Sequence, residues 1–89
     1  MSGGRDGIVE DLCERIARIA YLERAEVSEQ SRYVDDLMLD SSGAVQLLVE
    51  LEELYGVRFS DDEARLLETV DQTADLILSK LAGAEGGAG

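Results

Sequence analysis

The sequence predicts a small all-α domain, a bundle of three main helices plus one short helix, with a long loop between the first two. Apolar residues recur at spacings of three and four over three separate segments, which is the period of an amphipathic helix. The chain has 89 residues and no proline, which allows one domain and uninterrupted helices. No segment shows the signals of a strand.

Residues 8 to 22 form the first predicted helix. Its apolar stripe comprises Ile8, Val9, Leu12, Cys13, Ile16, Ile19 and Ala20. Because Cys13 lies on this stripe, we interpret it as a small core residue and not as a reactive thiol. Residues 1–7 are Gly-rich and polar, so we expect a flexible N-terminus there.

A long loop follows, in which Val27, Tyr33, Val34, Leu37 and Leu39 are spaced like anchors against a core. A loop of this length is uncommon in so small a domain and is often functional.

Residues 41 to 55 form the second predicted helix, which Gly56 ends. Its buried side is expected to comprise Val45, Leu48, Val49 and the stretch 51–55, with Gln46, Glu50 and Glu53 on the opposite side.

Two capping signals predict the remaining helices. Ser60 and Glu63 have capping-box spacing, and they start a short helix that ends near Leu67. Thr69 and Gln72 repeat the signal before the last helix. We expect that helix to end at residue 82, so that residues 8–82 form the domain and residues 83–89 a disordered Gly/Ala tail.

Composition limits both the partners and the chemistry. There are 20 acidic and 8 basic residues and no histidine, for a net charge of −12. Such a field repels nucleic acid and anionic membranes, so we expect neither as a ligand and expect protein partners with basic patches. Without histidine, the common Ser/His and Cys/His nucleophile systems and zinc sites are excluded. We therefore expect no enzyme activity in the chain itself.

The single cysteine rules out an internal disulfide, which fits a reducing cytoplasm, the location we expect. The longest apolar runs are three or four residues, far short of a membrane span. We expect the protein to be a monomer.

The stretch from Tyr33 to Ser42 ends the long loop and opens the second helix. On local grounds Asp40, Ser41 or Ser42 is an ordinary N-cap, and an acidic residue there complements the helix dipole. The spacing Asp36-x-Met38-x-Asp40 does not complete an EF-hand, because its sixth and twelfth positions hold serine and leucine.

The wider pattern resembles the acyl and peptidyl carrier proteins of fatty acid, polyketide and nonribosomal peptide synthesis. Tyr33 matches their aromatic position, and Asp40-Ser41 matches the dyad whose serine is modified. Further matches are Asp35, Asp36, Leu37, Val45, Leu47, Leu51, Glu52, Glu53, Tyr55, Gly56, Phe59, Asp61, Glu63, Ala64, Leu67, Thr69 and Val70. The resemblance covers residues 8 to 82 and implies an acyl-carrier-protein-like fold.

The resemblance also implies a function. A phosphopantetheinyl transferase would attach 4'-phosphopantetheine covalently to Ser41, with Asp40 helping to hold the magnesium in the transferase complex. The arm would carry acyl groups as thioesters to loading, synthase and tailoring enzymes with basic docking patches. The implied contacts for these partners are Asp40, Val45, Val49, Glu50, Glu52 and Glu53.

Two positions depart from the family pattern. Met38 stands where glycine is usual, which implies a loop backbone without positive φ or one that tolerates strain. Ser42 stands where leucine is usual, which removes an apolar contact at the start of the helix.

Several readings stay open. Leu39-Asp40 is typical of acyl carriers, and seven arginines to one lysine hint at a GC-rich bacterial gene. These features favour an acyl carrier in polyketide or other specialised-metabolite, including antibiotic, biosynthesis, and we expect it to be free-standing. The alternatives are a peptidyl, that is aminoacyl, carrier of a nonribosomal peptide pathway, or a helical adaptor domain that is not a carrier.

The charge generates a first prediction. Repulsion among carboxylates destabilises the compact state, so salt or divalent cations should raise the melting temperature. Thermal unfolding followed by circular dichroism at low and high ionic strength measures this. A melting temperature that neither addition changes would contradict the expected repulsion.

Overall fold

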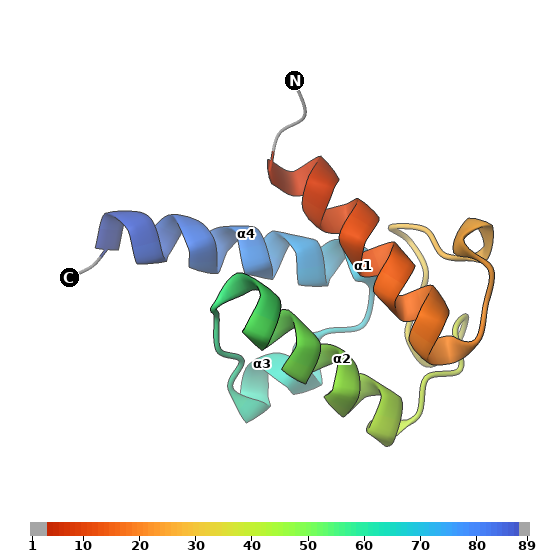
Figure 1. Cartoon of the computed structure of the whole chain (residues 1–89). Coiled ribbons are helices and arrows are strands. Elements are labelled where there is room, and N and C mark those ends of the chain that lie inside the picture. The colour runs from red at the N-terminus through yellow and green to blue at the C-terminus, as the bar shows by residue number, and fades with distance from the viewer. Residues whose placement is uncertain (1–3, 88–89) are drawn as a thin grey trace.

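The computed structural model describes residues 4–87 and shows a helical bundle (Figure 1). Its helices are α1 (Gly4–Ala20), α2 (Ser41–Tyr55), α3 (Asp61–Leu66) and α4 (Val70–Gly87), and a single 3-10 turn, η1 (Arg24–Glu26), lies in the long loop. The described residues contain no β-strand and only one isolated antiparallel bridge. The predicted all-α class with a short third helix is confirmed. None of the helices between residues 4 and 87 is long and apolar enough to cross a membrane.

The core forms where α1 packs against α4 and α2. Leu12 and Ile16 of α1, Leu51 of α2 and Ile77 of α4 are fully buried. Cys13 is also buried, as the stripe predicted. Burial raises the pKa of its thiol, which keeps it protonated and unreactive.

The outer helices extend beyond their predicted ends. Helix α1 begins at Gly4 instead of residue 8, and α4 continues through Gly83 to Gly87. A glycine inside a helix costs only about 1 kcal/mol relative to alanine, and Gly83 lies within α4 and does not end it. Arg5 also holds the first turn of α1 through ion pairs to Asp75, Glu29 and Asp71. Residues 1–3 and 88–89 of the predicted flexible ends lie outside the described residues.

Helix α1 ends two residues earlier than predicted. Tyr21 follows its last residue with a φ of 61°, and the N–H of Leu22 reaches back to the carbonyl of Ala17 at 2.8 Å. This is a Schellman-type ending with tyrosine in the place that glycine usually takes. Leu22 then packs against the core.

Helix α2 has the predicted bounds but a different buried face. Asp40 caps it and Gly56, with a φ of 69°, ends it. Leu47 and Leu51 are its buried residues, whereas Val45 and Val49 are exposed, contrary to the predicted packing. The prediction was wrong because it placed Val45 and Val49 on the same face as Leu48, whereas the inward face is the stripe spaced by three and four residues that comprises Ala44, Leu47, Leu48, Leu51 and Tyr55.

The long loop is anchored much as predicted. Val27, Leu37 and Leu39 are buried, and the Tyr33 hydroxyl forms a hydrogen bond with Thr73 Oγ1 of α4 at 2.5 Å. Val34 is the exception, since its side chain is 72% exposed. The backbone of the loop also forms hydrogen bonds with the segment that leads into α4. Tyr33 N donates to Glu68 O, and Val70 N donates to Ser31 O.

The two predicted capping boxes are present. Ser60 Oγ accepts from Glu63 N, and the Glu63 carboxylate accepts from Ser60 N. Thr69 and Gln72 make the same exchange at the start of α4. These local signals place α3 and α4 where the sequence predicted them.

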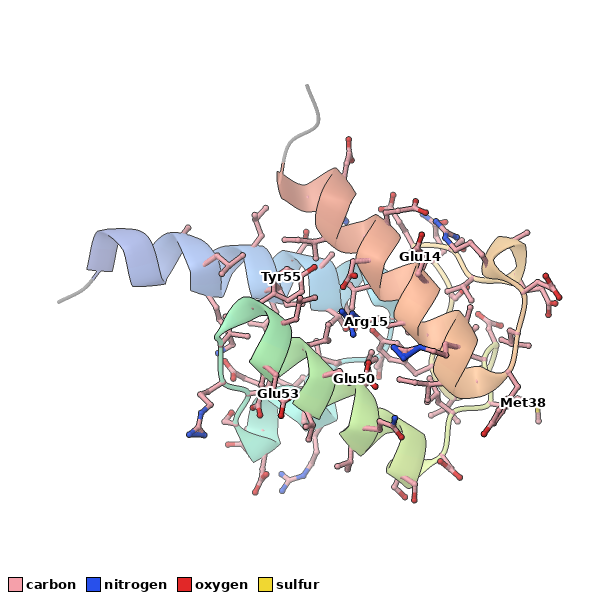
Figure 2. All side chains as sticks on the ribbon, in the orientation of Figure 1. Glu14, Arg15, Met38, Glu50, Glu53 and Tyr55 are labelled. Carbon is pink, nitrogen blue, oxygen red and sulfur yellow. The ribbon has the colours of Figure 1, made fainter. Side chains whose placement is uncertain are left out.

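A polar clamp joins α1 to α2, formed by Asp11, Arg15, Arg18, Glu50 and Tyr55. Arg15 and Arg18 each bond Glu50 Oε1 at 2.9 Å, and Arg15 Nε and the Tyr55 hydroxyl both donate to Asp11. Figure 2 shows Arg15 and Glu50 directed toward each other between the two helices. Burial, helped by the charge of Asp11, raises the pKa of Tyr55 to about 12, so Tyr55 keeps the proton that it donates.

The clamp predicts that Glu50→Gln lowers the free energy of unfolding by about 1 kcal/mol at pH 7. Burial raises the pKa of Glu50, but bonds from Gln46 and Arg15 and the charges of Arg18 and Arg15 outweigh it and leave the pKa lowered. A lowered native-state pKa stabilises the fold above the unfolded-state pKa, and this contribution disappears as the pH falls through the native-state value. The difference in free energy of unfolding between Glu50→Gln and the wild type should therefore shrink as the pH falls from about 5 to about 3.

Urea denaturation across that pH range provides the measurement. Glu53→Gln is the matched control, because Glu53 lies on the same helix, is exposed and has no ion pair among the described residues. It should shift stability by less than about 0.5 kcal/mol. Equal stability of Glu50→Gln and wild type at pH 7 would refute the clamp.

Candidate functional site

Ser41 is the first residue of α2 and is exposed. The helix begins there because Asp40, in extended conformation, accepts a hydrogen bond on Oδ1 from Gly43 N at 2.8 Å. This is an N-cap, which satisfies one of the backbone donors that the first turn leaves free. The cap fixes the direction in which α2 starts and leaves the Ser41 side chain on the surface.

The backbone of α2 at Gly43 lies close to the side chains of Leu39 and Ile19. A Cβ at Gly43 would lie 2.5 Å from Leu39 Cδ2 and 3.5 Å from Ile19 Cγ2. The last turn of α1, the end of the loop and the first turn of α2 therefore meet at one point. The sequence analysis missed Gly43, although a glycine within the first turn of a helix is a signal of such an approach.

Met38 precedes the cap in a left-handed conformation, with a φ of 54°. Of the two possibilities for a loop with methionine at position 38, a backbone without positive φ or a strained one, the structure shows the strained one. Its side chain is 83% exposed, and Figure 2 shows it directed outward beyond the loop. Packing gives no reason for a large apolar residue at this position.

Among residues 4–87, no side chain forms a hydrogen bond that would activate the Ser41 hydroxyl. Asp40 is engaged in the cap, and the chain has no histidine to act as a base. The positive end of the α2 dipole nevertheless favours a negatively charged group attached here. The site thus presents a passive hydroxyl that an external catalyst can reach.

The three glutamates predicted as partner contacts differ in their exposure and in the bonds that they already form. Glu50 belongs to the α1–α2 clamp and its side chain is 20% exposed, which leaves little of its carboxylate for a partner to contact. Glu52 accepts a hydrogen bond from Phe59 N at 2.9 Å, which fastens the turn after α2. Of the three predicted glutamates, only Glu53 is exposed and without an ion pair in the described part of the chain (Figure 2).

The predicted apolar contacts are on the open side of α2. The exposed fractions are 59% for Val45 and 46% for Val49, and these residues follow Ser41 by one and two turns. They form an apolar stripe that leads away from the serine.

An apolar cavity of about 210 Å³ lies on the other side of α2. It is lined by Tyr33, Val34, Leu39, Ala44, Leu47, Leu48, Ala64, Leu67 and Thr73. Burial raises the pKa of Tyr33, so its hydroxyl stays protonated and bonded to Thr73 at the cavity wall. Since Ala44 and Leu39 belong to the cap region, the cavity adjoins the start of α2.

The chain is similar to proteins of a known family. Residues 10–77 match the family model described as a phosphopantetheine attachment site. An acyl carrier protein of Acidothermus cellulolyticus is 33% identical over 84 residues, covering 94% of this chain and 100% of that protein. "Polyketide-8 synthase acyl carrier protein 2" of Streptomyces avermitilis is 36% identical over 72 residues, covering 81% and 83%.

A solved structure has the same fold. The acyl carrier protein from Enterococcus faecalis superposes with a TM-score of 0.74 at 29% identity, covering 88% of this chain and 99% of that chain.

The strain at Met38 predicts that Met38→Gly raises the free energy of unfolding. Relief of a left-handed side-chain clash gains about 1–2 kcal/mol, and the greater freedom of glycine in the unfolded chain offsets about 0.4–1 kcal/mol of this. We expect a net gain of roughly 0.5 kcal/mol, measured by urea denaturation.

Met38→Ala is the matched control. It removes the same exposed side chain but keeps a Cβ in the left-handed conformation, so no gain is expected. A glycine variant less stable than the alanine variant would contradict the strain at this position.

Proposed function

The chain belongs to the acyl carrier protein family, whose members carry covalently attached 4'-phosphopantetheine, and we propose that Ser41 is the attachment residue. The observation that supports it best is the exposed hydroxyl of Ser41 directly behind the Asp40 cap. Ser42 is also exposed, but the dyad that resembles the family motif is Asp40-Ser41. Proteins of this family are carriers and not catalysts, which agrees with a serine that has no base beside it.

The local chemistry fits the group. The attached arm is joined through a phosphodiester, and the N-terminus of a 15-residue helix favours that negative charge. The exposure of Ser41 leaves room for the arm to leave the surface. When attached, the arm supplies the thiol that holds cargo as a thioester.

Activation of the serine must come from a phosphopantetheinyl transferase that uses coenzyme A. Asp40 uses Oδ1 in the cap, and Oδ2 has no hydrogen bond among the described residues. The described residues contain no group of three or more His, Cys, Asp or Glu side chains placed to bind a metal ion. We therefore assign Asp40 as one ligand of a magnesium ion whose remaining ligands belong to the transferase and coenzyme A.

The cargo that we propose is an acyl group. The cavity beside α2 is lined almost entirely by aliphatic side chains. Its two hydroxyl groups, on Tyr33 and Thr73, form a hydrogen bond with each other. Such a lining accepts hydrocarbon and offers no acidic side chain to the ammonium group of an aminoacyl cargo. The relatives named above are also acyl carriers.

For the pathway we propose polyketide or related specialised-metabolite biosynthesis, which the name of the Streptomyces avermitilis relative supports. Loading, synthase and tailoring enzymes would then dock on the open side of α2. Val45, Val49 and Glu53 are the exposed contacts there, with Glu52 beside them. Glu50 contributes through the clamp that holds α2 and not through direct contact.

The attachment site predicts one modification. Incubated with coenzyme A, magnesium and a broad-specificity phosphopantetheinyl transferase, the protein should gain one phosphopantetheine by intact mass spectrometry. Ser41→Ala should abolish the gain, because it removes the accepting oxygen.

Ser42→Ala is the control, since it removes a neighbouring exposed hydroxyl and should leave the gain intact. No gain in the wild type, or an undiminished gain in Ser41→Ala, would refute the assignment. A gain lost only in Ser42→Ala would move the site by one residue.

A further inference from the structure

A second cavity adjoins the apolar cavity beside α2. Its volume is about 340 Å³, and its walls come from the long loop and from the end of α3 with the residues that follow it. Tyr33, Val34 and Leu67 line both cavities, so the two are neighbours that share one wall. This explains the 72% exposure of Val34, whose side chain lines two cavities instead of packing into the core.

The remaining wall of the second cavity is charged. It is formed by Arg32, Asp35, Arg65 and Glu68. Two of the eight basic residues of the chain therefore line this one cavity. The lining of the first cavity, in contrast, holds no charged residue. An apolar cavity next to the start of α2 thus adjoins a second one that offers charge.

Both arginines of the second cavity keep free hydrogen-bond donors. Arg32 Nη1 lies 3.4 Å from Asp35 Oδ2, and Arg65 Nη1 lies 3.1 Å from Asp62 Oδ1. Among residues 4–87, the two guanidinium groups donate no other hydrogen bond. Exposed ion pairs of this kind contribute little stability, so a ligand can replace them. The planar guanidinium group binds a carboxylate through two parallel N–H···O bonds.

We propose that the cargo is an acyl group whose far end carries a carboxylate, and that Arg32 and Arg65 bind this carboxylate in the second cavity. The inference rests on the proposed attachment at Ser41 and defines the cargo more closely. Ala44, one turn after Ser41, lines the first cavity, so an arm attached at Ser41 can place its acyl chain between the apolar walls. The chain then passes Val34 and reaches the second cavity with its charged end.

Charge explains why such a cargo needs these arginines. The net charge of −12 repels a carboxylate over most of the surface, and burial of an unpaired carboxylate in the apolar cavity is costly. Glu68 also lines the second cavity and would favour an ammonium group. The carboxylate is favoured because two guanidinium groups face the cavity and Asp35 is already paired with Arg32.

The test compares cargos of equal length with and without a terminal carboxylate. The broad-specificity transferase loads Ser41 from the coenzyme A thioesters of three pairs of acyl groups: hexanoyl and adipyl, octanoyl and suberyl, decanoyl and sebacyl. Cleavage of each thioester by hydroxylamine, followed by intact mass spectrometry, measures how well the protein protects the cargo.

The double variant Arg32→Gln/Arg65→Gln should raise the cleavage rate of the best-protected dicarboxylic cargo about fivefold. It should leave the rates of the three alkyl cargos unchanged, because their chains carry no charge. Both arginines are exposed, so the substitutions should keep the fold intact. Arg58→Gln is the matched control, since Arg58 is also exposed and lines neither cavity. It should change no rate.

Three results would overturn the proposal. The first is a double variant with wild-type cleavage rates for all dicarboxylic cargos. The second is equal acceleration of the alkyl cargos, because the arginines would then act on the fold and not on the carboxylate. The third is an ω-amino-octanoyl cargo that is better protected than the suberyl cargo, which would assign the second cavity to an ammonium group.

These outcomes are separable from failure of the proposed function. If the wild type is loaded from none of the coenzyme A thioesters, the attachment itself is refuted. If it is loaded at Ser41 but the cleavage rates do not depend on Arg32 and Arg65, only the dicarboxylic cargo is refuted.

Discussion

The close approach between the first turn of α2, the end of the loop and the last turn of α1 is the constraint on which the site depends. Gly43 allows it, because any Cβ there would meet the side chain of Leu39. With Leu39 buried beneath it, the backbone reaches Asp40 in the extended conformation that a cap requires. The position of Ser41 is therefore set by packing of the loop end and the adjoining first turn of α2 against the last turn of α1, which is distant in sequence. The Ser41 side chain itself is exposed and is not part of the core.

A second constraint is charge. In a chain with 20 acidic and 8 basic residues, seven of the basic residues form ion pairs within the described part: Arg5, Arg15, Arg18, Arg24, Arg32, Arg65 and Lys80. Several of them join elements, as Arg15 and Arg18 do between α1 and α2. The excess carboxylates remain on the surface, where they favour partners of opposite charge. Several of the few basic residues therefore link elements of the fold, and the many acidic ones give the surface its sign.

The features that the sequence predicted well are those set by local chemistry. The Asp40 cap and Gly56 define α2, and Ser60 and Thr69 begin the next two helices, because each signal acts within one turn. The predicted buried face of α2 was wrong at Val45 and Val49, because these residues lie off the stripe of Ala44, Leu47, Leu48 and Leu51 that packs inward. The role of Glu50 depends on Arg15 and Arg18, which lie more than thirty residues away, and no local pattern reveals that pairing. Tyr21 carries no sequence signal either, since the left-handed turn after α1 is ordinarily made by glycine.

The central claim is that Ser41, the residue that directly follows the Asp40 cap and completes the Asp40-Ser41 dyad, is modified in preference to its exposed neighbour Ser42. Ser41 and Ser42 differ in their relation to the Asp40 cap and not in exposure. The most direct measurement is fragmentation mass spectrometry of the modified wild-type protein, with cleavage between residues 41 and 42. The account predicts that the phosphopantetheine mass remains with the fragments that end at Ser41. The same mass found only in fragments that begin at Ser42 would contradict it.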